Sequence, residues 1–431
     1  MKHCMGKGSG SMNDICLIKT PAYELLDDRL EPHLGLMYLA SYAKINSIDA
    51  VVCDLSEQQP EEWQIPAAKL YGFTTFSTTY MRTLEVVKRV KAINPNAITV
   101  AGGAHASALP NEVARDFDYV VIGEGEKALI NIFGGRATTN PVVIGEPINR
   151  LDLIPFPKYS MVDIESYKRR VDGKKSFSIQ SSRGCPYRCL FCNSTIMGGH
   201  KPVRFRTPNN VVAEIKDLRS KYGDIGIRFQ DDIFGSQAAW LETFTDLIKP
   251  LDIHYRAFVR TTQCCKDGFV DMLYDGGCRH IAMGIESGSD RILKAMQKGQ
   301  TVEQCRQGIK KAKAAGLIVR IYLIVGFPGE TWDTVNDTLE LIKETQPDEF
   351  VVYPLIPYPG TPMYYHPEQY GLYNINPDFT HYFQICGDGH SEFVYDLKDH
   401  DREELTAMKQ YLVNELDKLK IAWARDSKDY V

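Results

Sequence analysis

The sequence predicts an α/β protein built on two parallel sheets, an amino-terminal Rossmann-like doubly wound sheet and a partial (β/α)6 barrel of the TIM type. Three observations support this prediction. Short apolar runs alternate with amphipathic stretches from residue 14 to residue 129, the same alternation resumes at Phe177, and a proline-containing stretch without periodicity lies between the two series. A length of 431 residues exceeds the usual size of one domain, so two domains are expected.

The first series contains five apolar runs that we expect to form the strands of the open sheet. These are residues 15–18, 50–53, 70–74, 97–101 and 119–122, with helices expected at 34–46, 79–93 and near 111–116. In such sheets, ligands bind beyond the carboxyl ends of the strands. Glycines follow two of these ends, Gly102 and Gly103 in one case and Gly123 and Gly125 in the other, and a missing Cβ lets backbone approach a bulky ligand.

The second series supplies six strands, which we expect to curl into an open barrel. They begin at Phe177 and continue at residues 225–230, 254–259, 280–285, 319–325 and 349–354, with amphipathic helices such as 211–222 and 302–315 between them. Gly316 follows the second of these helices and is expected to end it. The active site of such a barrel belongs at the carboxyl-terminal ends of its strands.

Three cysteines, Cys185, Cys189 and Cys192, lie within eight residues in a loop that follows the first of these strands. Thiolates at such close spacing favour an iron–sulfur cluster or zinc, and a [4Fe–4S] cluster held by only three cysteines keeps one iron open for another ligand. An open iron indicates chemistry. The alternative is a structural zinc site, which would need a fourth ligand such as His200.

The C-x3-C-x2-C spacing, with Phe191 before the last cysteine, resembles the signature of the radical S-adenosylmethionine (SAM) superfamily. The resemblance implies that SAM chelates the open iron of a [4Fe–4S] cluster and is cleaved reductively to methionine and a 5′-deoxyadenosyl radical. It also implies an electron donor such as flavodoxin or ferredoxin. Four later strand ends match the family in the same order, and they contain Gln230-Asp231-Asp232, Gly284-Ile285-Glu286-Ser287-Gly288, the segment 323–331 and the segment 353–362.

From this resemblance we expect a carboxylate after the second strand to hold the SAM amino group, with the neighbouring acid capping a helix. Glu286 is expected to accept from the ribose hydroxyls, and the segment around Gly326 to contact adenine. Arg260 either contacts the SAM carboxylate or pairs with a neighbouring acid. The expected cluster ligands are Cys185, Cys189 and Cys192, and the expected SAM-binding residues are Phe191, Gln230, Asp231, Asp232, Arg260, Glu286, Ser287, Gly326, Tyr353 and Pro354.

Segments 32–40, 101–106 and 118–126 of the first series resemble the cobalamin (B12)-binding domain fused to one branch of these enzymes. The Asp-x-His-x-x-Gly motif of other cobalamin proteins is absent, so the resemblance implies a base-off cobalamin without a protein histidine on cobalt. His105 would be the exception, and the alternative is that it is a polar loop residue that hydrogen-bonds to backbone. The expected cobalamin-binding residues are Leu34, Gly35, Thr75, Ser77, Gly102, Gly103, Ala104, His105, Gly123, Glu124, Gly125 and Glu126. A relic domain that binds no corrinoid remains an alternative.

The expected organisation has five parts. Residues 1–11 form a flexible, tag-like leader, 12–140 the B12-binding domain, 141–172 a linker, 173–367 the radical SAM core, and 368–431 a mixed or helical carboxyl-terminal cap that shapes the substrate site. Cys386 with His381 and His390 could instead suggest a metal site in this last part.

Composition narrows the classes of function. A formal net charge of −5 shows no basic excess for nucleic acid, and no apolar run reaches the roughly 18 residues expected of a membrane span. No secretion signal is evident, so we expect a cytoplasmic protein that acts on a small molecule or natural product. Because an iron–sulfur cluster is implied, we also expect it to be oxygen-sensitive.

The expected function is the cleavage of SAM to a 5′-deoxyadenosyl radical that removes hydrogen from an unactivated carbon, followed by C-methyl transfer from cobalamin. Such hydrogen removal needs a radical, because no side-chain base has a suitable pKa. One alternative keeps the radical and the corrinoid but ends in cyclisation, ring rearrangement or oxidation. Another is a non-catalytic corrinoid or redox sensor that has kept the cluster loop.

Overall fold

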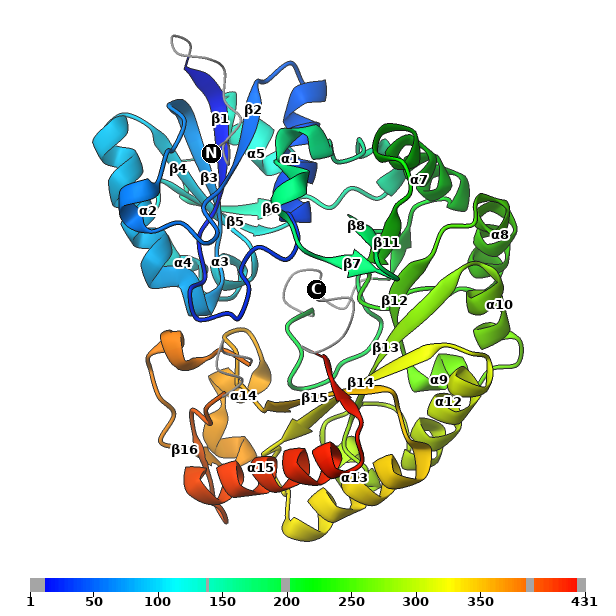
Figure 1. Cartoon of the computed structure of the whole chain (residues 1–431). Helices are drawn as coiled ribbons and strands as arrows, with labels where there is room; N and C mark the ends of the chain where they lie inside the picture. The colour runs from blue at the N-terminus through cyan, green and yellow to red at the C-terminus, as the bar shows by residue number, and fades with distance from the viewer. Residues whose placement is uncertain (1–11, 137–138, 195–201, 385–390, 425–431) are drawn as a thin grey trace.

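The computed structural model describes residues 12–136, 139–194, 202–384 and 391–424. The expected leader, the zinc candidate His200, and the metal candidates Cys386 and His390 lie outside these residues. Figure 1 shows the amino-terminal sheet with its helices beside the barrel, and the carboxyl-terminal segment next to both.

The amino-terminal domain is a six-stranded parallel sheet with the order β2-β1-β3-β4-β5-β6. Its strands are β1 Asn13–Lys19, β2 Ala50–Asp54, β3 Ala68–Thr74, β4 Ile98–Gly102, β5 Tyr119–Gly123 and β6 Val142–Gly145. Its helices are α1 Leu34–Ile45, α2 Tyr80–Ile93, α3 Ala104–Ala108, α4 Pro110–Val113 and α5 Glu126–Phe133. The doubly wound prediction is confirmed. Strand β6 adds a sixth strand from residues that the sequence places in the linker.

The strands of this sheet are apolar on both faces because each face packs against helices. In β1, Ile15 and Leu17 join the core under α1 and α5, whereas Cys16 and Ile18 join a second core under α2. The order of the strands reverses between β1 and β3, and a crevice for ligands is expected at the carboxyl edge there.

The second domain is an eight-stranded curled sheet with the order β18-β15-β14-β13-β12-β11-β8-β7. The six predicted strands are confirmed as the parallel central strands β8 Lys174–Ile179, β11 Gly226–Phe229, β12 Tyr255–Val259, β13 Cys278–Glu286, β14 Ile318–Val325 and β15 Glu349–Pro354. Between them run α7 Pro208–Tyr222, α8 Ala238–Ile248, α9 Thr261–Cys264, α10 Phe269–Asp275, α11 Asp290–Ala295, α12 Val302–Ala314 and α13 Trp332–Thr345. The larger helices cover the outside of the sheet (Figure 1).

Short strands complete both edges of the barrel sheet. At one edge, β7 Arg170–Val171 pairs antiparallel with β8, and at the other, β18 Ala422–Trp423 pairs parallel with β15. The segment expected as a cap therefore contributes to the barrel itself. It also contains α14 Pro362–Tyr365, β16 Leu372–Tyr373, β17 Asp396–Leu397 and α15 Arg402–Lys418, and α15 packs on α13.

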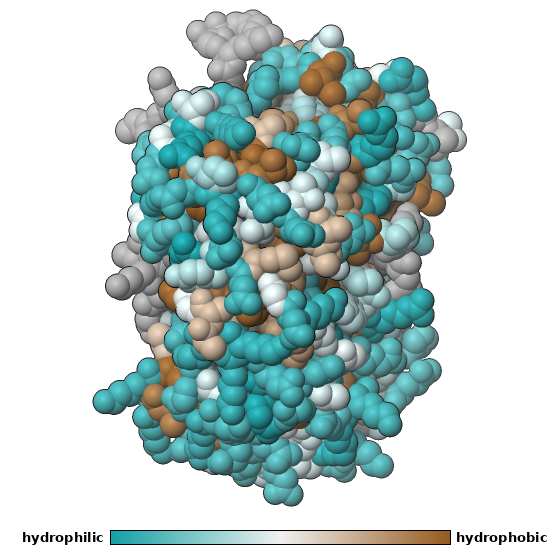
Figure 2. Space-filling model, turned by 90° about the vertical axis from the view of Figure 1, so that its right-hand side faces the viewer, coloured by the Kyte–Doolittle hydropathy of each residue, from teal (hydrophilic) through white to brown (hydrophobic). Residues whose placement is uncertain are grey.

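The face of the molecule in Figure 2 is mostly hydrophilic, and its hydrophobic residues form small separate patches. Among the described residues, no helix combines the length and the apolar character needed to cross a membrane.

Candidate active site

The loop that carries the three cysteines leaves the barrel after β8 and is held at its base by a buried carboxylate. Asp231, which follows β11, accepts from the backbone nitrogen of Ser181 at 3.0 Å and from the hydroxyls of Ser181 and Ser182 at 2.7 and 2.5 Å. Burial raises the pKa of Asp231 to about 6 even though these donors favour its charged form. The carboxylate of Asp231 is therefore occupied by the loop, which it positions.

The three cysteines lie close enough together to affect one another's ionisation. Burial raises the pKa of Cys185, and the neighbouring Asp232, Cys192 and Cys189 raise it further. Burial also raises the pKa of Cys192, with Cys189 and Asp232 again contributing. The carboxylate of Asp232 thus lies near enough to these two thiols to raise their pKa values.

These residues fit a cluster with one open iron, because three soft ligands adjoin a carboxylate that suits an ammonium group. In a [4Fe–4S] cluster each cysteine binds a different iron, so the sulfurs need not meet at one point. In the part of the chain that the structure describes, no three His, Cys, Asp or Glu side chains converge as ligands of a single ion.

Glu286 ends β13 in a conformation that few non-glycine residues adopt. Its φ is 66°, and its Oε1 accepts from the Nζ of Lys298 at 2.6 Å in a pair that is almost completely buried. A Cβ at Gly284 would lie 2.2 Å from this Oε1, so only glycine leaves room for the pair. Strain of this kind persists where surrounding structure fixes it, and it clusters at functional sites.

The Glu286–Lys298 pair is also joined to the cysteine loop through Lys298, a residue that no sequence motif indicated. Its Nζ lies 5.7 Å from the ring centroid of Phe191, and its carbonyl accepts from the guanidinium of Arg260. The guanidinium of Arg260 in turn lies 3.6 Å from the ring centroid of Tyr187 in the loop. The only signal in the sequence is a lysine followed by a glycine, Gly299, just after a short helix.

Gln230 contacts the amino-terminal domain. Its Nε2 donates to Oε2 of Glu31 at 2.8 Å and to the hydroxyl of Ser178 at 3.1 Å, and Glu31 also pairs with Arg228. Glu31 precedes α1, so a loop of the first domain reaches the first two strands of the barrel. The amide nitrogen of Gln230 therefore connects the domains.

The loop after β14 is shaped by the carboxyl-terminal segment. Gly326 has a φ of 88°, its backbone nitrogen donates to Glu330 at 2.7 Å, and its carbonyl accepts from the hydroxyl of Tyr395 at 2.7 Å. A Cβ at Gly326 would lie 2.5 Å from a ring carbon of Phe393. The segment expected as a cap thus fixes the predicted adenine-side loop.

The remaining predicted SAM residues lie at the same edge. The buried hydroxyl of Ser287 accepts from the backbone nitrogen of Ser289 at 3.2 Å. Tyr353 stacks on Tyr322 with ring centroids 5.8 Å apart, and Pro354 ends β15 beside Val325. All ten predicted residues therefore come from one edge of the sheet, although their side chains do not share one direction.

At the amino-terminal sheet, hydrogen bonds link the ends of three strands. The Thr75 hydroxyl donates to the Gly102 carbonyl at 2.9 Å and accepts from the Ala106 nitrogen at 3.0 Å. The Gly123 nitrogen, at the end of β5, donates to the hydroxyl of Ser107 at 3.1 Å. These bonds make one wall from the ends of β3, β4 and β5.

This wall fits a large flat ligand such as cobalamin. A Cβ at Gly102 would meet no atom within 4 Å, so the backbone there faces open space, and Phe76, the residue after Thr75, is 46% exposed. Such a rim presents backbone and apolar surface, as a macrocycle requires. Leu34 and Gly35, at the start of α1, are half-buried and exposed respectively, and Ala104 begins α3.

His105 is buried and directed at protein groups. Its Nδ1 lies 2.9 Å from the hydroxyl of Ser77, and its ring lies between those of Tyr80 and Phe379, with centroid distances of 4.4 and 5.5 Å. Burial lowers the pKa of His105 to about 4, so the ring is neutral. The hydrogen bond of the ring is thus to a side chain of the segment after β3, whereas the expected alternative was a bond to backbone.

Glu124 and Glu126 have arginine partners in the barrel domain. Glu124 pairs with Arg183 at 3.2 Å and with Arg204, and Glu126 pairs with Arg183 at 2.6 Å. Gly125, between them, lies so near Leu39 of α1 that an added Cβ would approach within 3.2 Å. The two acids expected to bind cobalamin therefore connect the end of β5 to the cysteine loop.

Comparison with known proteins gives a consistent result. The model of the radical SAM superfamily matches residues 179–342, and the model of the B12-binding domain matches residues 29–133. The uncharacterized methyltransferase PH0819 of Pyrococcus horikoshii is 32% identical over 357 residues, which cover 77% of each chain. This chain belongs to the radical SAM superfamily. It is a B12-dependent radical SAM enzyme whose cofactors are a [4Fe–4S] cluster, SAM and cobalamin.

Two further relatives of this radical SAM enzyme are informative. Anaerobic magnesium-protoporphyrin IX monomethyl ester cyclase of Rubrivivax gelatinosus is 26% identical over 352 residues, which cover 74% of this chain and 63% of the cyclase. The radical SAM methyltransferase TsrM of Kitasatospora setae has the same fold, with a TM-score of 0.71 at 18% identity over 94% of this chain and 89% of TsrM.

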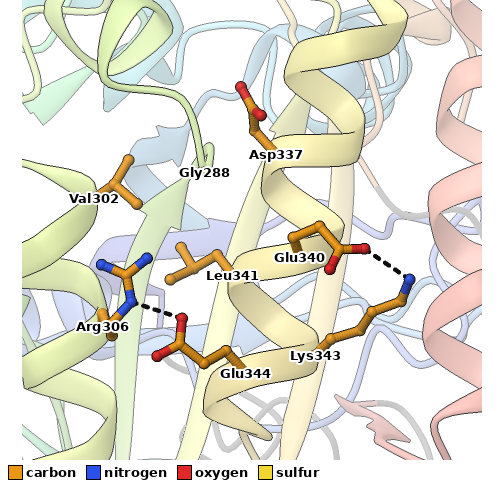
Figure 3. Close-up of a pocket in the computed structure, with 8 residues that line it drawn as sticks. All are labelled: Gly288, Val302, Arg306, Asp337, Glu340, Leu341, Lys343 and Glu344. Carbon is orange, nitrogen blue, oxygen red and sulfur yellow. Dashed lines mark hydrogen bonds and ion pairs between the residues drawn. The ribbon is translucent and has the colours of Figure 1, made fainter.

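The radical SAM enzyme also has a surface pocket of about 590 Å³ between α12 and α13 on the outside of the barrel (Figure 3). Arg306 binds Glu344 at 2.7 Å across it, and Lys343 binds Glu340 at 2.8 Å. Four of the charged residues of its wall thus form two pairs, and no residue of the wall is a predicted cofactor ligand. We assign it no function.

Proposed function

We propose that this radical SAM enzyme transfers a methyl group to an unactivated carbon of a small molecule. One observation supports this most: groups from the carboxyl edges of both sheets lie at the cysteine loop. Arg183, two residues before Cys185, binds Glu124 and Glu126 just after β5, and Asp232, in the loop after β11, lies near enough to Cys185 to raise its pKa. A substrate between the edges would be within reach of both domains, and the relative PH0819 is described as a methyltransferase.

We assign the cluster to Cys185, Cys189 and Cys192. When bound, the cluster and SAM supply a 5′-deoxyadenosyl radical, and cobalamin supplies a transferable methyl group. Asp232 is the carboxylate we assign to the SAM ammonium, because Asp231 is occupied by Ser181 and Ser182. Asp231 and Gln230 instead hold the loop and the neighbouring domain in place.

Glu286 is the residue we assign to the ribose. Its Oε1 is bound by Lys298, so Oε2 is the atom that accepts from sugar hydroxyls. Lys298 thereby orients the acceptor. The backbone at Gly326 and the ring of Tyr353 are the surfaces we assign to adenine, and Arg260 holds the cysteine loop through Tyr187.

Cobalamin is assigned to the rim formed by Gly102, Gly103 and Gly123. We propose that it is base-off and that no histidine of the protein binds cobalt, because the His105 ring is held between Tyr80 and Phe379. A further requirement of the family is an electron donor, for which we propose a flavodoxin or ferredoxin.

Methyl transfer is tested with SAM that carries a trideuteriomethyl group. The protein is reconstituted anaerobically with iron, sulfide and cobalamin, then incubated with a strong reductant and a small-molecule extract of its host. We expect 5′-deoxyadenosine together with a product heavier by one trideuteriomethyl group in place of hydrogen. Formation of 5′-deoxyadenosine and a changed small molecule without deuterium would overturn the proposal. The C185A variant serves as the control for cluster-independent labelling.

Cyclisation or oxidation without methyl transfer is the second candidate. The likeness to the cyclase of Rubrivivax gelatinosus supports it, since the similar region covers 74% of this chain. The same experiment separates the two, because the product of cyclisation or oxidation would carry no trideuteriomethyl group.

A further inference from the structure

The cysteine loop of this enzyme is closed at its base by a two-stranded ribbon that carries two arginines side by side. Strand β9 Ser182–Arg183 pairs antiparallel with β10 Arg204–Phe205, and Arg183 lies directly opposite Arg204. Like charges in this arrangement repel, and a ribbon this short has few hydrogen bonds to oppose the repulsion. The ribbon therefore depends on groups outside it.

Acids of the B12-binding domain supply those groups. The Arg183 guanidinium binds Glu126 at 2.6 Å and Glu124 at 3.2 Å, and Arg204 binds both oxygens of Glu124. All four side chains are at most 15% exposed. Burial alone would raise the pKa of Glu124, but Arg204 and Arg183 bring it below its usual value, so it is charged at neutral pH.

Glu124 is itself rigidly placed in its own domain. Its Oε2 accepts from the backbone nitrogen of Ile148 at 3.0 Å, and Arg204 donates to the carbonyl of the same residue at 2.6 Å. Gly145 of β6 lies so close that an added Cβ would be 1.9 Å from the Glu124 carbonyl oxygen. A shift of the ribbon would therefore have to break these contacts rather than bend a flexible side chain.

A second contact fixes the neighbouring strands. Glu31 accepts from the hydroxyl of Ser178 on β8 at 2.6 Å and from Gln230 after β11 at 2.8 Å. The carboxylates at positions 31, 124 and 126 thus hold the part of the barrel from which the cysteine loop emerges. They come from the loop before α1 and from the three residues that follow β5, where the cobalamin rim lies.

We propose that Arg183 and Arg204 are positioning residues that, through Glu124 and Glu126, set the separation between the cluster loop and the cobalamin rim. This rests on the assignments of the two cofactors made above. The four residues contact one another and need not touch a cofactor. Their effect is to make the rim and the loop move as one unit, so that a substrate can face both cofactors at a constant distance.

The test measures the dipolar coupling between cob(II)alamin and the reduced cluster by pulsed electron paramagnetic resonance. Wild type is expected to give one narrow distance distribution. In the double variant E124Q/E126Q both arginines lose their charged partners, and we expect a broad or shifted distribution at unchanged iron and cobalamin content. R204K keeps the positive charge but loses the bidentate contact with Glu124, so we expect it to broaden the distance distribution less.

The matched control is E344Q. Glu344 also binds two basic side chains, Arg306 and Lys310, but it does so on the outer surface of the barrel, and its variant should retain the wild-type distribution. A narrow, unshifted distribution in E124Q/E126Q would overturn the proposal. If that variant loses a cofactor, hydrogen exchange of the backbone amides of residues 182–183 and 204–205 is measured in the apo-protein instead. Exchange as slow as in wild type would then overturn the proposal.

These outcomes do not depend on methyl transfer. A narrow wild-type distribution that broadens in E124Q/E126Q would support the positioning role even if no labelled product were ever found. Conversely, labelled product with the same distribution in every variant would support the proposed function and reject the positioning role.

Discussion

The carboxyl edges of the two sheets are built from different groups. At the barrel edge the groups are charged side chains: Glu286 pairs with Lys298, whose Nζ lies 5.7 Å from the ring centroid of Phe191, and Asp232 raises the pKa of Cys185. At the amino-terminal edge, the wall is backbone tied by the short hydroxyls of Thr75 and Ser107. The barrel edge therefore suits a small charged ligand, and the other edge a large flat one.

Because of this difference, substitutions at the two edges should have different effects. Removing Glu286 from the barrel edge would leave its buried partner Lys298 without a compensating charge. A hydroxyl at the other edge leaves only a backbone group unsatisfied, which costs less. Substitutions at the barrel edge should therefore abolish SAM chemistry, whereas those at the rim should weaken cobalamin retention and leave SAM cleavage intact.

The largest effect is expected at the cysteine loop. C185A, C189A and C192A should each lose cluster iron and all detectable 5′-deoxyadenosine, since the open iron exists only while three thiolates hold the cluster. Iron content and chromatography of the reaction measure this. C265A is the matched control, because the thiol of Cys265 lies beside the Gln304 carbonyl, away from the loop. An active C189A enzyme with full iron would contradict the assignment.

The next effect is expected at Glu286. E286Q removes the carboxylate that neutralises buried Lys298, and breaking a buried ion pair by deleting one partner costs about 3–5 kcal/mol. We expect a lower melting temperature and at least about tenfold weaker SAM binding, since a charged hydrogen bond to ribose is also lost. Equilibrium dialysis of the reconstituted protein measures the binding.

E303Q is the matched control for this variant. Glu303 pairs with Arg306 on the exposed face of α12, so its loss should change neither property. Unchanged SAM binding in E286Q would remove the ribose assignment, while the pairing with Lys298 would remain as a purely structural contact.

The same contrast explains how much of the site the sequence could predict. The barrel strands and their polar ends follow from apolar periodicity and from residue types that suit SAM. The role of Lys298 could not be predicted, because this residue lies after a short helix and its pairing with Glu286 depends on the space left by Gly284. Asp231 and Asp232 are adjacent, and only the path of the chain after β11 decides which one faces the thiols.

At the amino-terminal edge, sequence indicates where the chain turns but not where side chains point. Gly102 and Gly123 lie at strand ends as predicted, because a strand followed by glycine is a local pattern. Glu124 and Glu126 were expected to face cobalamin, yet they bind arginines about 60 to 80 residues further along the chain. Glu31 bonds to Gln230, 199 positions away, and no local pattern carries such a contact.

A third prediction concerns pH and the loop after β14. Burial raises the pKa of Glu330 to about 7, well above the value of about 4.3 expected in the unfolded chain. The folded state therefore favours the protonated form, and this stability is present below about pH 4.3 and is lost as pH rises through about 7. Between these limits the group should change the free energy of unfolding by about 4 kcal/mol.

The measurement is chemical unfolding of wild type and E330Q across this pH range. E330Q keeps an acceptor for the Gly326 nitrogen but cannot ionise, so its advantage over wild type should grow as pH rises. E340Q, which alters only an exposed pair with Lys343, should follow wild type at every pH. Parallel curves for wild type and E330Q would show that Glu330 has an ordinary pKa.

The smallest effect is expected at the rim. T75V keeps the size of the side chain but removes the bond to the Gly102 carbonyl and leaves the Ala106 nitrogen without its acceptor. An unsatisfied buried donor costs about 1–3 kcal/mol, so the end of β4 should loosen. We expect weaker cobalamin retention, measured by the visible spectrum after gel filtration, with iron content and SAM cleavage unchanged.

T245V distinguishes this local effect from general loss of stability. The Thr245 hydroxyl is also buried and donates to a carbonyl, that of Met272, but it lies in α8 on the outside of the barrel. If T75V and T245V lost cobalamin equally, the rim would have no special part in binding. If T75V also lowered SAM cleavage, the two edges would not be separable, because a change confined to backbone and hydroxyl groups of one sheet would then reach the charged groups of the other.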